Sequence, residues 1–455
     1  MRRTDVNMLS GSITKGLLAM TIPIMIMNVM QTMFSVIDMT VLGKLANDTA
    51  VGAVGACGML ITLCTGLLIG ISTGANVIVA KHIGEGDRQK TEDAVGTALL
   101  FAVLGGFVLL IIGVSCAETF LRWTNCPEDL LPQAVKYFRI YFWGVPIIML
   151  YNFSASILRA AGDTRRPMYF LIMGGIIKIL LNFFCITVLN LTVEGVALAT
   201  VASNAIAGGL ALFVLLRIDD KFHITLKSIK INMTELKSIL FVGVPTGLQS
   251  ALYSFANVII TTAVNNFGAD ATTGIAIANQ FDGILYQISC APSLATIPYV
   301  AQNIGAGNIK RAKQTVLKAT FITIAFGASF GALSAIFSRQ LSSLMSTTPE
   351  VIKFSQQKMM IISSTYFICG INEIMGGALK GMGKPIIPTV ATLLFMCVIR
   401  FFWVYLLFPL CPNLTFLYLV WPVGWILSII TLLFAFFPTV KKLETNNGLE
   451  LVHNK

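Results

Sequence analysis

Long apolar runs dominate the chain, and they constrain its fold more than any other feature. Most are about 20 to 30 residues long, which is the length a tilted helix needs to cross a hydrocarbon core of about 30 Å. Of the 455 residues, 56% are hydrophobic and only 12% are charged, which is too apolar for a soluble domain of this length. The alternating ten-residue segments of a membrane barrel do not occur. The sequence therefore predicts an all-α integral membrane protein.

Glycine, proline and charged residues divide the apolar runs into twelve expected transmembrane helices. We place the first six at 15–42, 50–82, 92–121, 131–160, 165–189 and 193–217, and the second six at 235–267, 272–303, 311–344, 350–380, 385–409 and 414–439. Most Lys and Arg residues then fall at one set of helix ends, which predicts a multi-pass protein of the cell membrane with both termini in the cytoplasm. Topology thus explains the net charge of +11, and we expect no nucleic-acid partner.

The two halves of the chain repeat each other at an offset of about 220 residues. Pro23 matches Pro245, VAKHIGEG at 79–86 matches VAQNIGAG at 300–307, and LRAAGDTRRP from Leu158 matches LKGMGKPIIP from Leu379. An even number of helices per half gives a parallel repeat with a pseudo-twofold axis along the membrane normal. The predicted domains are an N-terminal six-helix lobe at 1–217, a cytoplasmic connector at 218–234, a C-terminal six-helix lobe at 235–440 and a cytoplasmic tail at 441–455.

The repeated glycine pairs Gly84/Gly86 and Gly305/Gly307 each end an expected helix beside a basic turn. Since no strand precedes them, they do not match a phosphate-binding loop. We predict that they cap the helices and reverse the chain.

Only three acidic residues lie well inside the expected spans: Asp38, Asp282 and Glu373. A carboxylate at membrane depth is costly, so each is a candidate for ion or substrate handling. Asp38 is predicted to accept a proton or Na⁺, the alternative being a buried carboxylate that only bonds its neighbours. Glu373 either faces a cavity or pairs with Arg400, and Asp282 belongs either to a helix-to-helix hydrogen-bond network or to a cation site.

Two basic residues, Lys178 and Arg400, also fall within expected spans. Because they lie near helix ends, we expect their side chains to extend towards the membrane interface, and we give neither a ligand role.

The paired lobes with Pro23, Gln31 and Asp38, the doubled VAxxIGxG turns, and ILRAAGDTRRP echoed by ALKGMGKPIIP resemble the multidrug and toxic compound extrusion (MATE) family. The resemblance covers nearly the whole chain. It implies a V-shaped, twelve-helix antiporter that exports cationic, amphipathic compounds in exchange for H⁺ or Na⁺. From the residues themselves we expect no enzymatic activity, cofactor or bound metal. The expected partners are small organic cations and the lipid bilayer, and we expect a monomer.

The resemblance also implies site residues. Asp38 matches the first-helix aspartate of the bacterial branches, and Asn182 and Thr200 match its asparagine and threonine partners in the DinF-type branch, which gives the expected ion-coupling set. Ile186 stands where that branch has a second aspartate, and Tyr253 and Cys369 stand where the NorM-type branch has acidic residues. The residues expected to line the substrate cavity are Gln31, Tyr137, Asn152, Tyr253, Asn279, Gln280, Asp282 and Glu373.

Two other functions compete with antiport. A flippase of the related lipid-linked oligosaccharide exporters would have several Arg or Lys in its cavity to hold pyrophosphate. A channel or membrane scaffold would have no coupled cycle and would conduct without a driving ion or not at all. The chain has no GxxxxGK[ST] loop and no recognisable set of catalytic residues, so we expect a gradient rather than a nucleotide to drive any transport.

Overall fold

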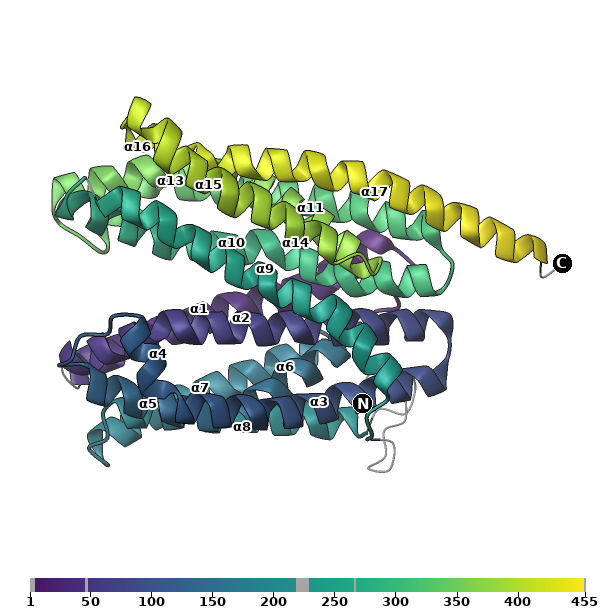
Figure 1. Ribbon diagram of the computed structural model, residues 1–455, viewed down its shortest axis with the longest axis horizontal. Helices are drawn as coiled ribbons and strands as arrows, with labels where there is room; N and C mark the ends of the chain where they lie inside the picture. Colours follow the sequence, from purple (N-terminus) through teal and green to yellow (C-terminus); the bar gives the residue numbers. More distant parts are fainter. Residues whose placement is uncertain (1–4, 46–47, 218–228, 266, 454–455) are drawn as a thin grey trace. The chain divides into compact units, whose positions relative to one another are not determined.

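A computed structural model describes residues 5–45, 48–217, 229–265 and 267–453 of the chain (Figure 1). The described residues form helices joined by turns and contain no strand, which confirms the all-α prediction. Eleven of the described helices are long and apolar enough to cross a membrane. The pair α5 (Leu131–Trp143) and α6 (Val145–Ala160), bent by 47°, passes the same test when its two helices are taken together, which gives up to twelve candidate spans. Of the predicted connector at 218–234, residues 218–228 lie outside the described residues.

The chain divides into two compact units. Unit 1 contains Ile26–Gly247 and the few residues before Asn7, and unit 2 contains Asn7–Met25 and everything from Leu248 onwards. Helices α1 (Ile13–Leu45) and α9 (Met233–Asn265) therefore each contribute to both units. Each changes unit shortly after its internal proline, Pro23 or Pro245. Proline removes one backbone hydrogen bond from a helix, so both helices are locally weakened where they pass from one unit to the other.

Unit 1 is arranged around α6. Its other helices are α2 (Asp48–Glu85), α3 (Arg88–Ser115), α4 (Ala117–Trp123), α5, α7 (Arg165–Thr187) and α8 (Val193–Leu215). Helix α6 packs against α2, α3 and α8, and α7 runs beside α8 (Figure 1). Most residues of α6 are buried, as expected for a helix that is surrounded by others.

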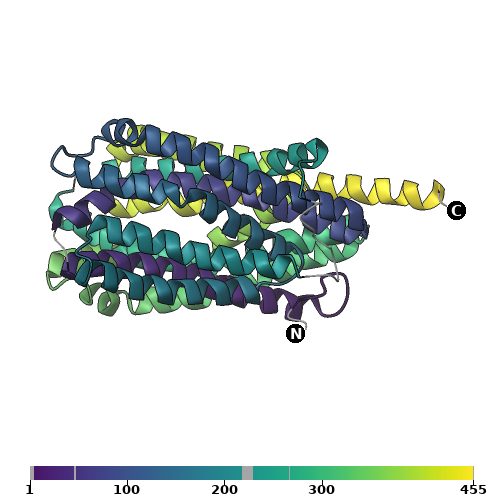
Figure 2. The same ribbon diagram turned by 90° about the horizontal axis from the view of Figure 1, so that it is seen from below.

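Unit 2 is arranged around the helix that corresponds to α6 in the repeat. Its helices are α10 (Ala269–Gly305), α11 (Ile309–Ile336), α12 (Ser338–Ser343), α13 (Pro349–Gly381), α14 (Ile386–Thr392), α15 (Ile399–Phe402), α16 (Leu414–Tyr418) and α17 (Val420–His453). Helix α13 packs against α10, α11 and α17. The end of α17 extends past the other helices of this unit (Figures 1 and 2).

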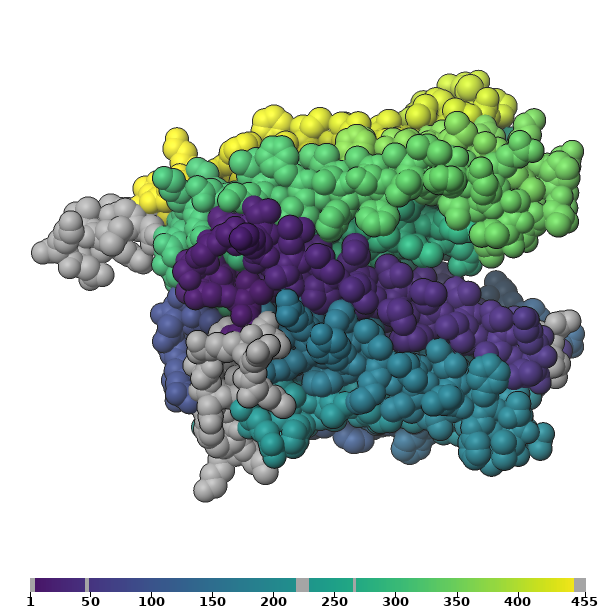
Figure 3. Space-filling model, turned by 180° about the vertical axis from the view of Figure 1, so that it is seen from behind, coloured from purple at the N-terminus to yellow at the C-terminus, as the bar shows by residue number. Residues whose placement is uncertain are grey.

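The start of the chain is tied to unit 2 by backbone carbonyls. Arg311 on α11 donates to the carbonyl oxygens of Met8, Ser10 and Gly11, and Asn303 on α10 donates to that of Met8. In Figure 3 the beginning of the chain accordingly lies against the helices coloured green. These bonds explain why Asn7–Met25 belongs to unit 2, although it precedes the whole of unit 1 in the sequence.

The repeated turns confirm the predicted glycine caps. Gly86 follows α2 with φ +73° and Gly307 follows α10 with φ +71°, a backbone conformation that favours glycine. After the first of these turns, the carboxylate of Asp87 accepts a hydrogen bond from the backbone N–H of Lys90 and caps α3. That bond, with the nearby ammonium of Lys90, lowers the pKa of Asp87.

Helices α2 and α9 cross at two facing GxxxG sequences, Gly70–Gly74 and Gly243–Gly247. A Cβ atom at Gly70 would lie 2.2 Å from the Cα of Gly247, and one at Gly74 would lie 2.1 Å from the carbonyl oxygen of Ile239. Both distances are far below any contact between real atoms. The backbones can approach this closely only because small residues line the crossing.

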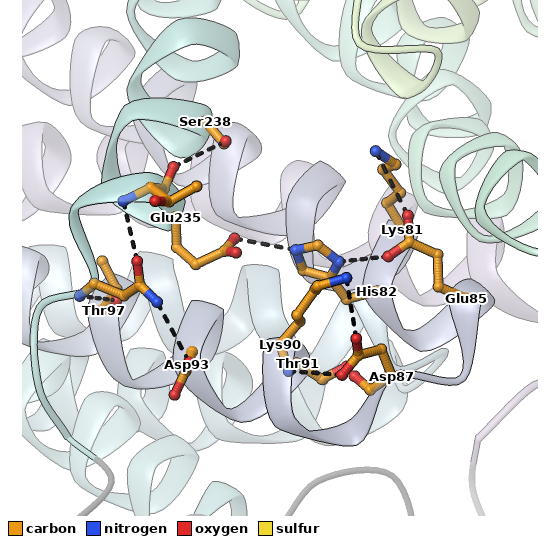
Figure 4. Close-up of polar contacts among 12 residues, drawn as sticks. Lys81, His82, Glu85, Asp87, Lys90, Thr91, Asp93, Thr97, Glu235 and Ser238 are labelled. Carbon is orange, nitrogen blue, oxygen red and sulfur yellow. Dashed lines mark hydrogen bonds and ion pairs between the residues drawn. The ribbon is translucent and has the colours of Figure 1, made fainter.

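The first turn of α9 is held against α2 by a histidine (Figure 4). The Nε2 atom of His82, in the last turn of α2, lies 3.0 Å from the carboxylate of Glu235, and its Nδ1 atom lies 2.8 Å from that of Glu85. Just before α9, the backbone N–H of Asn232 donates to the hydroxyl of Thr97 on α3. The beginning of α9 is thereby fixed to α2 and α3 within unit 1.

Candidate ion-coupling site

Asp38 on α1 is buried, and both of its carboxylate oxygens bind donors from α7. The Nζ atom of Lys178 lies 2.5 Å from Oδ2, and the amide nitrogen of Asn182 donates to Oδ1 at 2.7 Å. Lys178 and Asn182 are four residues apart, so they lie on one face of the helix. Sequence reasoning proposed Asn182 but missed Lys178, although a lysine one turn from the proposed partner was the available signal.

The pairing with Lys178 decides the charge of this site. The two side chains are each 12% exposed, and a buried ion pair is tolerated only when geometry is good and the remaining polar atoms are bonded. The amide of Asn182, itself fully buried, supplies the second bond. The expectation that Lys178 extends to the membrane interface is therefore wrong, because its ammonium group gains more from the carboxylate of Asp38.

The other residues predicted for the N-terminal lobe mostly bond within their own helices. Thr200 on α8 donates to the carbonyl of Val196, and Asn152 on α6 donates to that of Ile148. Tyr137 on α5 is buried, whereas Gln31 on α1 is exposed.

In unit 2, Glu373 on α13 accepts a hydrogen bond from the hydroxyl of Tyr253 on α9 at 3.1 Å. The amide of Asn372 donates to the same hydroxyl at 3.4 Å. Arg400 on α15 instead donates to the amide oxygen of Asn257 at 2.8 Å. Glu373 therefore does not pair with Arg400, which was one of the two possibilities left open by the sequence. It accepts a hydrogen bond from Tyr253 instead. Arg400 is 1% exposed, so the expectation that it extends to the interface is wrong.

Asp282 on α10 is paired with Lys358 on α13 at 2.9 Å. Lys358 also donates to the amide oxygen of Asn279, while Gln280 is exposed. Asp282 therefore belongs to a helix-to-helix network, which is one of the two possibilities left open by the sequence. The sequence did not reveal Lys358 as the partner of Asp282, because a lysine near the beginning of an expected span is typical of the charges that end a membrane helix.

Comparisons with known proteins agree on one family. A family model described as MatE matches residues 23–184 and 245–406, one match for each half of the chain. The chain is 28% identical to the "Probable multidrug resistance protein YoeA" of Bacillus subtilis, over 84% of each chain. It is 25% identical to the "FAD transporter" of Shewanella oneidensis, over 85% of this chain and 86% of the relative.

The solved structures show the same fold. An outward-facing multidrug resistance MATE family transporter of the MOP superfamily superposes with a TM-score of 0.89 at 20% identity, over 98% of this chain and all of the other. The two MatE matches begin at Pro23 and Pro245, the residues near which α1 and α9 change unit.

Proposed function

The chain belongs to the MATE family of membrane transporters, and from this premise we propose that it is a secondary antiporter that exports amphipathic organic compounds. Members of this family are transporters and not enzymes. In the proposed cycle, inward movement of H⁺ drives export by alternating access. The observation that carries the proposal is Asp38, held between Lys178 and Asn182 in a span of unit 1.

Proton binding changes the charge of this site by one unit. The pair of Asp38 and Lys178 is neutral while the carboxylate is ionised, and it becomes positive once a proton is bound. Protonation also removes the attraction that holds the ammonium group of Lys178. A conformational equilibrium responds to any ligand that binds one state better than the other, so the proton can bias the exchange between inward-open and outward-open states.

Asn182 can serve both protonation states of Asp38. Its amide nitrogen donates to the ionised carboxylate, and its amide oxygen, buried, has no hydrogen-bond partner among the described residues. An amide carries two donors and an acceptor. After a turn of the amide, the oxygen can accept the O–H of a protonated Asp38, which keeps the neutral acid bonded inside the protein.

The position of Lys178 favours H⁺ over Na⁺ as the coupling ion. Its ammonium group already lies 2.5 Å from Asp38, where a metal cation would have to bind, and two like charges at such a distance repel strongly in a low-dielectric interior. A proton adds to a carboxylate oxygen without needing a shell of oxygen ligands. We therefore propose H⁺ coupling.

Cationic amphipaths are the cargo that the family resemblance implies, and they fit this site as competitors of Lys178 for the carboxylate. The names of the relatives include both multidrug resistance and FAD. These names do not indicate one charge for the cargo, so the proposal rests on this chain's own residues.

The test is efflux of the cationic dye ethidium from proteoliposomes, driven in separate experiments by a pH gradient and by a Na⁺ gradient. We expect the pH gradient alone to drive efflux, and Asp38→Asn to reduce it to the level of empty liposomes. Asp270→Asn, an exposed aspartate at the start of α10, is the matched control and should retain the wild-type rate. Efflux driven only by Na⁺ would refute H⁺ coupling, and an undiminished rate in Asp38→Asn would refute the role of this carboxylate.

A further inference from the structure

A second group of buried charges surrounds one aromatic ring in unit 2. The Nζ atom of Lys358 lies 5.8 Å from the centre of the Trp421 ring, and the guanidinium carbon of Arg400 lies 5.1 Å from it. Both cations therefore lie beside the same aromatic ring. With Asp282, which pairs with Lys358, these residues form what we call the Trp421 charge cluster.

The cluster carries one more positive charge than negative. Asp282 balances Lys358, but the described partners of Arg400 are all uncharged: the amide oxygen of Asn257, the sulfur of Met396 and the ring of Trp421. Arg400 is 1% exposed, and its Nε atom has no hydrogen-bond partner among the described residues. A buried charge without a counter-charge is strongly unfavourable, so this guanidinium is incompletely compensated in the protein alone.

Two further features indicate a binding site rather than a structural charge. The hydroxyl of Tyr418, whose ring lies 6.4 Å from that of Trp421, is also buried without a partner in the described part of the chain. Arg400 lies on the short α15, between two π-helical segments at Leu393–Val398 and Trp403–Leu407. Such segments occur often at functional sites.

The accessible end of the cluster is polar. Asn257 and Asn279, which bond Arg400 and Lys358 respectively, are exposed, whereas both cations are buried. A ligand can therefore meet the two amides first and the charges behind them. Guanidinium and ammonium groups select carboxylate, sulfonate or phosphate oxygens, and the ring of Trp421 offers an apolar surface beside them.

We propose that the Trp421 charge cluster binds the anionic group of an amphipathic compound exported by the protein. The inference rests on the proposed export function and adds to its cationic cargo compounds that carry a carboxylate, sulfonate or phosphate, including zwitterions. A phospholipid headgroup has the same chemistry, so the test separates the two sources.

The experiment measures equilibrium binding without any gradient, on protein in nanodiscs of phosphatidylcholine. The probe is 1-pyrenebutyrate, which quenches tryptophan fluorescence by energy transfer, and its uncharged counterpart is 1-pyrenebutanol. We expect the carboxylate to bind at least tenfold more tightly than the alcohol. Arg400→Gln should remove this preference, Arg400→Lys should keep most of it, and Lys310→Gln, an exposed lysine of α11, should leave it unchanged.

Asp282→Asn gives the sharpest prediction, because this substitution is expected to strengthen the binding of pyrenebutyrate. Removing this carboxylate frees Lys358 and raises the net charge of the cluster, so pyrenebutyrate should bind several-fold more tightly. If these residues served only to hold the helices together, Asp282→Asn would weaken binding or leave it unchanged, and that result would overturn the proposal. Equal binding of the carboxylate and the alcohol to the wild-type protein would overturn it as well.

Two additional arms identify the source of the anionic group and separate this inference from the coupling mechanism. Displacement of the probe when part of the phosphatidylcholine is replaced by phosphatidylglycerol would assign the cluster to a lipid headgroup and refute the cargo. Asp38→Asn/Lys178→Met, which removes both charges of the buried pair, should bind pyrenebutyrate as the wild type does. A failure of ethidium efflux with intact pyrenebutyrate binding would then count against the proposed antiport only.

Discussion

Lys178 supplies the charge that makes an ionised Asp38 tolerable between helices. The two side chains are largely buried and in direct contact, so each compensates the desolvation of the other. Removing one partner of a buried ion pair leaves a charge without compensation, which typically costs about 3–5 kcal/mol, whereas removing both is often nearly neutral.

We therefore expect Lys178→Met to be strongly destabilising and Asp38→Asn/Lys178→Met to recover much of the loss. The measurement is the midpoint of thermal unfolding in detergent, followed by size-exclusion chromatography of the heated protein. Lys136→Met is the control, because Lys136 pairs with Glu194 at 3.5 Å on the surface, where ion pairs contribute about 0–1 kcal/mol. Additive effects of the Asp38 and Lys178 substitutions would show that the two charges do not interact.

At the scale of whole helices, the crossing of α2 and α9 depends on glycine at four positions. The atoms that a Cβ would meet at Gly70 and Gly74 belong to the backbone of α9, so no side chain can move aside to make room. Adding a methyl group there forces the helices apart.

We expect Gly74→Ala to destabilise the protein by about 1–3 kcal/mol or more, as overpacking generally does. Gly58→Ala on the same helix is the control, because a Cβ there meets nothing within 4 Å. Alanine is the better helix former by up to about 1 kcal/mol, so this control should match or exceed the wild type in thermal stability. Equal stability of the two variants would contradict the close crossing.

For the whole molecule, the repeat explains which helix each unit is built around. Helices α6 and α13 end at Ala160 and Gly381, matching positions of the two halves, and each packs against several other helices of its unit. Six spans in each half return the chain to its starting side of the membrane. The distribution of Lys and Arg then predicts cytoplasmic termini.

This topology is tested with reporter fusions. Green fluorescent protein fused after Lys455 should fluoresce, and alkaline phosphatase fused there should be inactive, because the predicted C-terminus is cytoplasmic. Fusions to chains truncated after Asn190, in the turn between α7 and α8, should give the reverse pattern. Phosphatase activity at Lys455 with fluorescence at Asn190 would invert the topology.

The sequence by itself determined the helices, the repeat and which carboxylates lie inside the expected spans. Hydropathy locates a membrane span because its length and composition are local properties, and recurring turns such as those at Gly86 and Gly307 reveal the repeat directly. Asp38, Asp282 and Glu373 were recognisable because charge inside an apolar run is rare.

Only the tertiary structure decided which partner each charge has. Asp38 and Lys178 lie on different helices far apart in the sequence, as do Asp282 and Lys358, and Arg400 proved to be buried beside Trp421 rather than extended to the interface. Whether two charges meet depends on how each helix is rotated and how far it is shifted along its neighbour. Those quantities are set by packing across the whole bundle, so no local pattern in the sequence contains them.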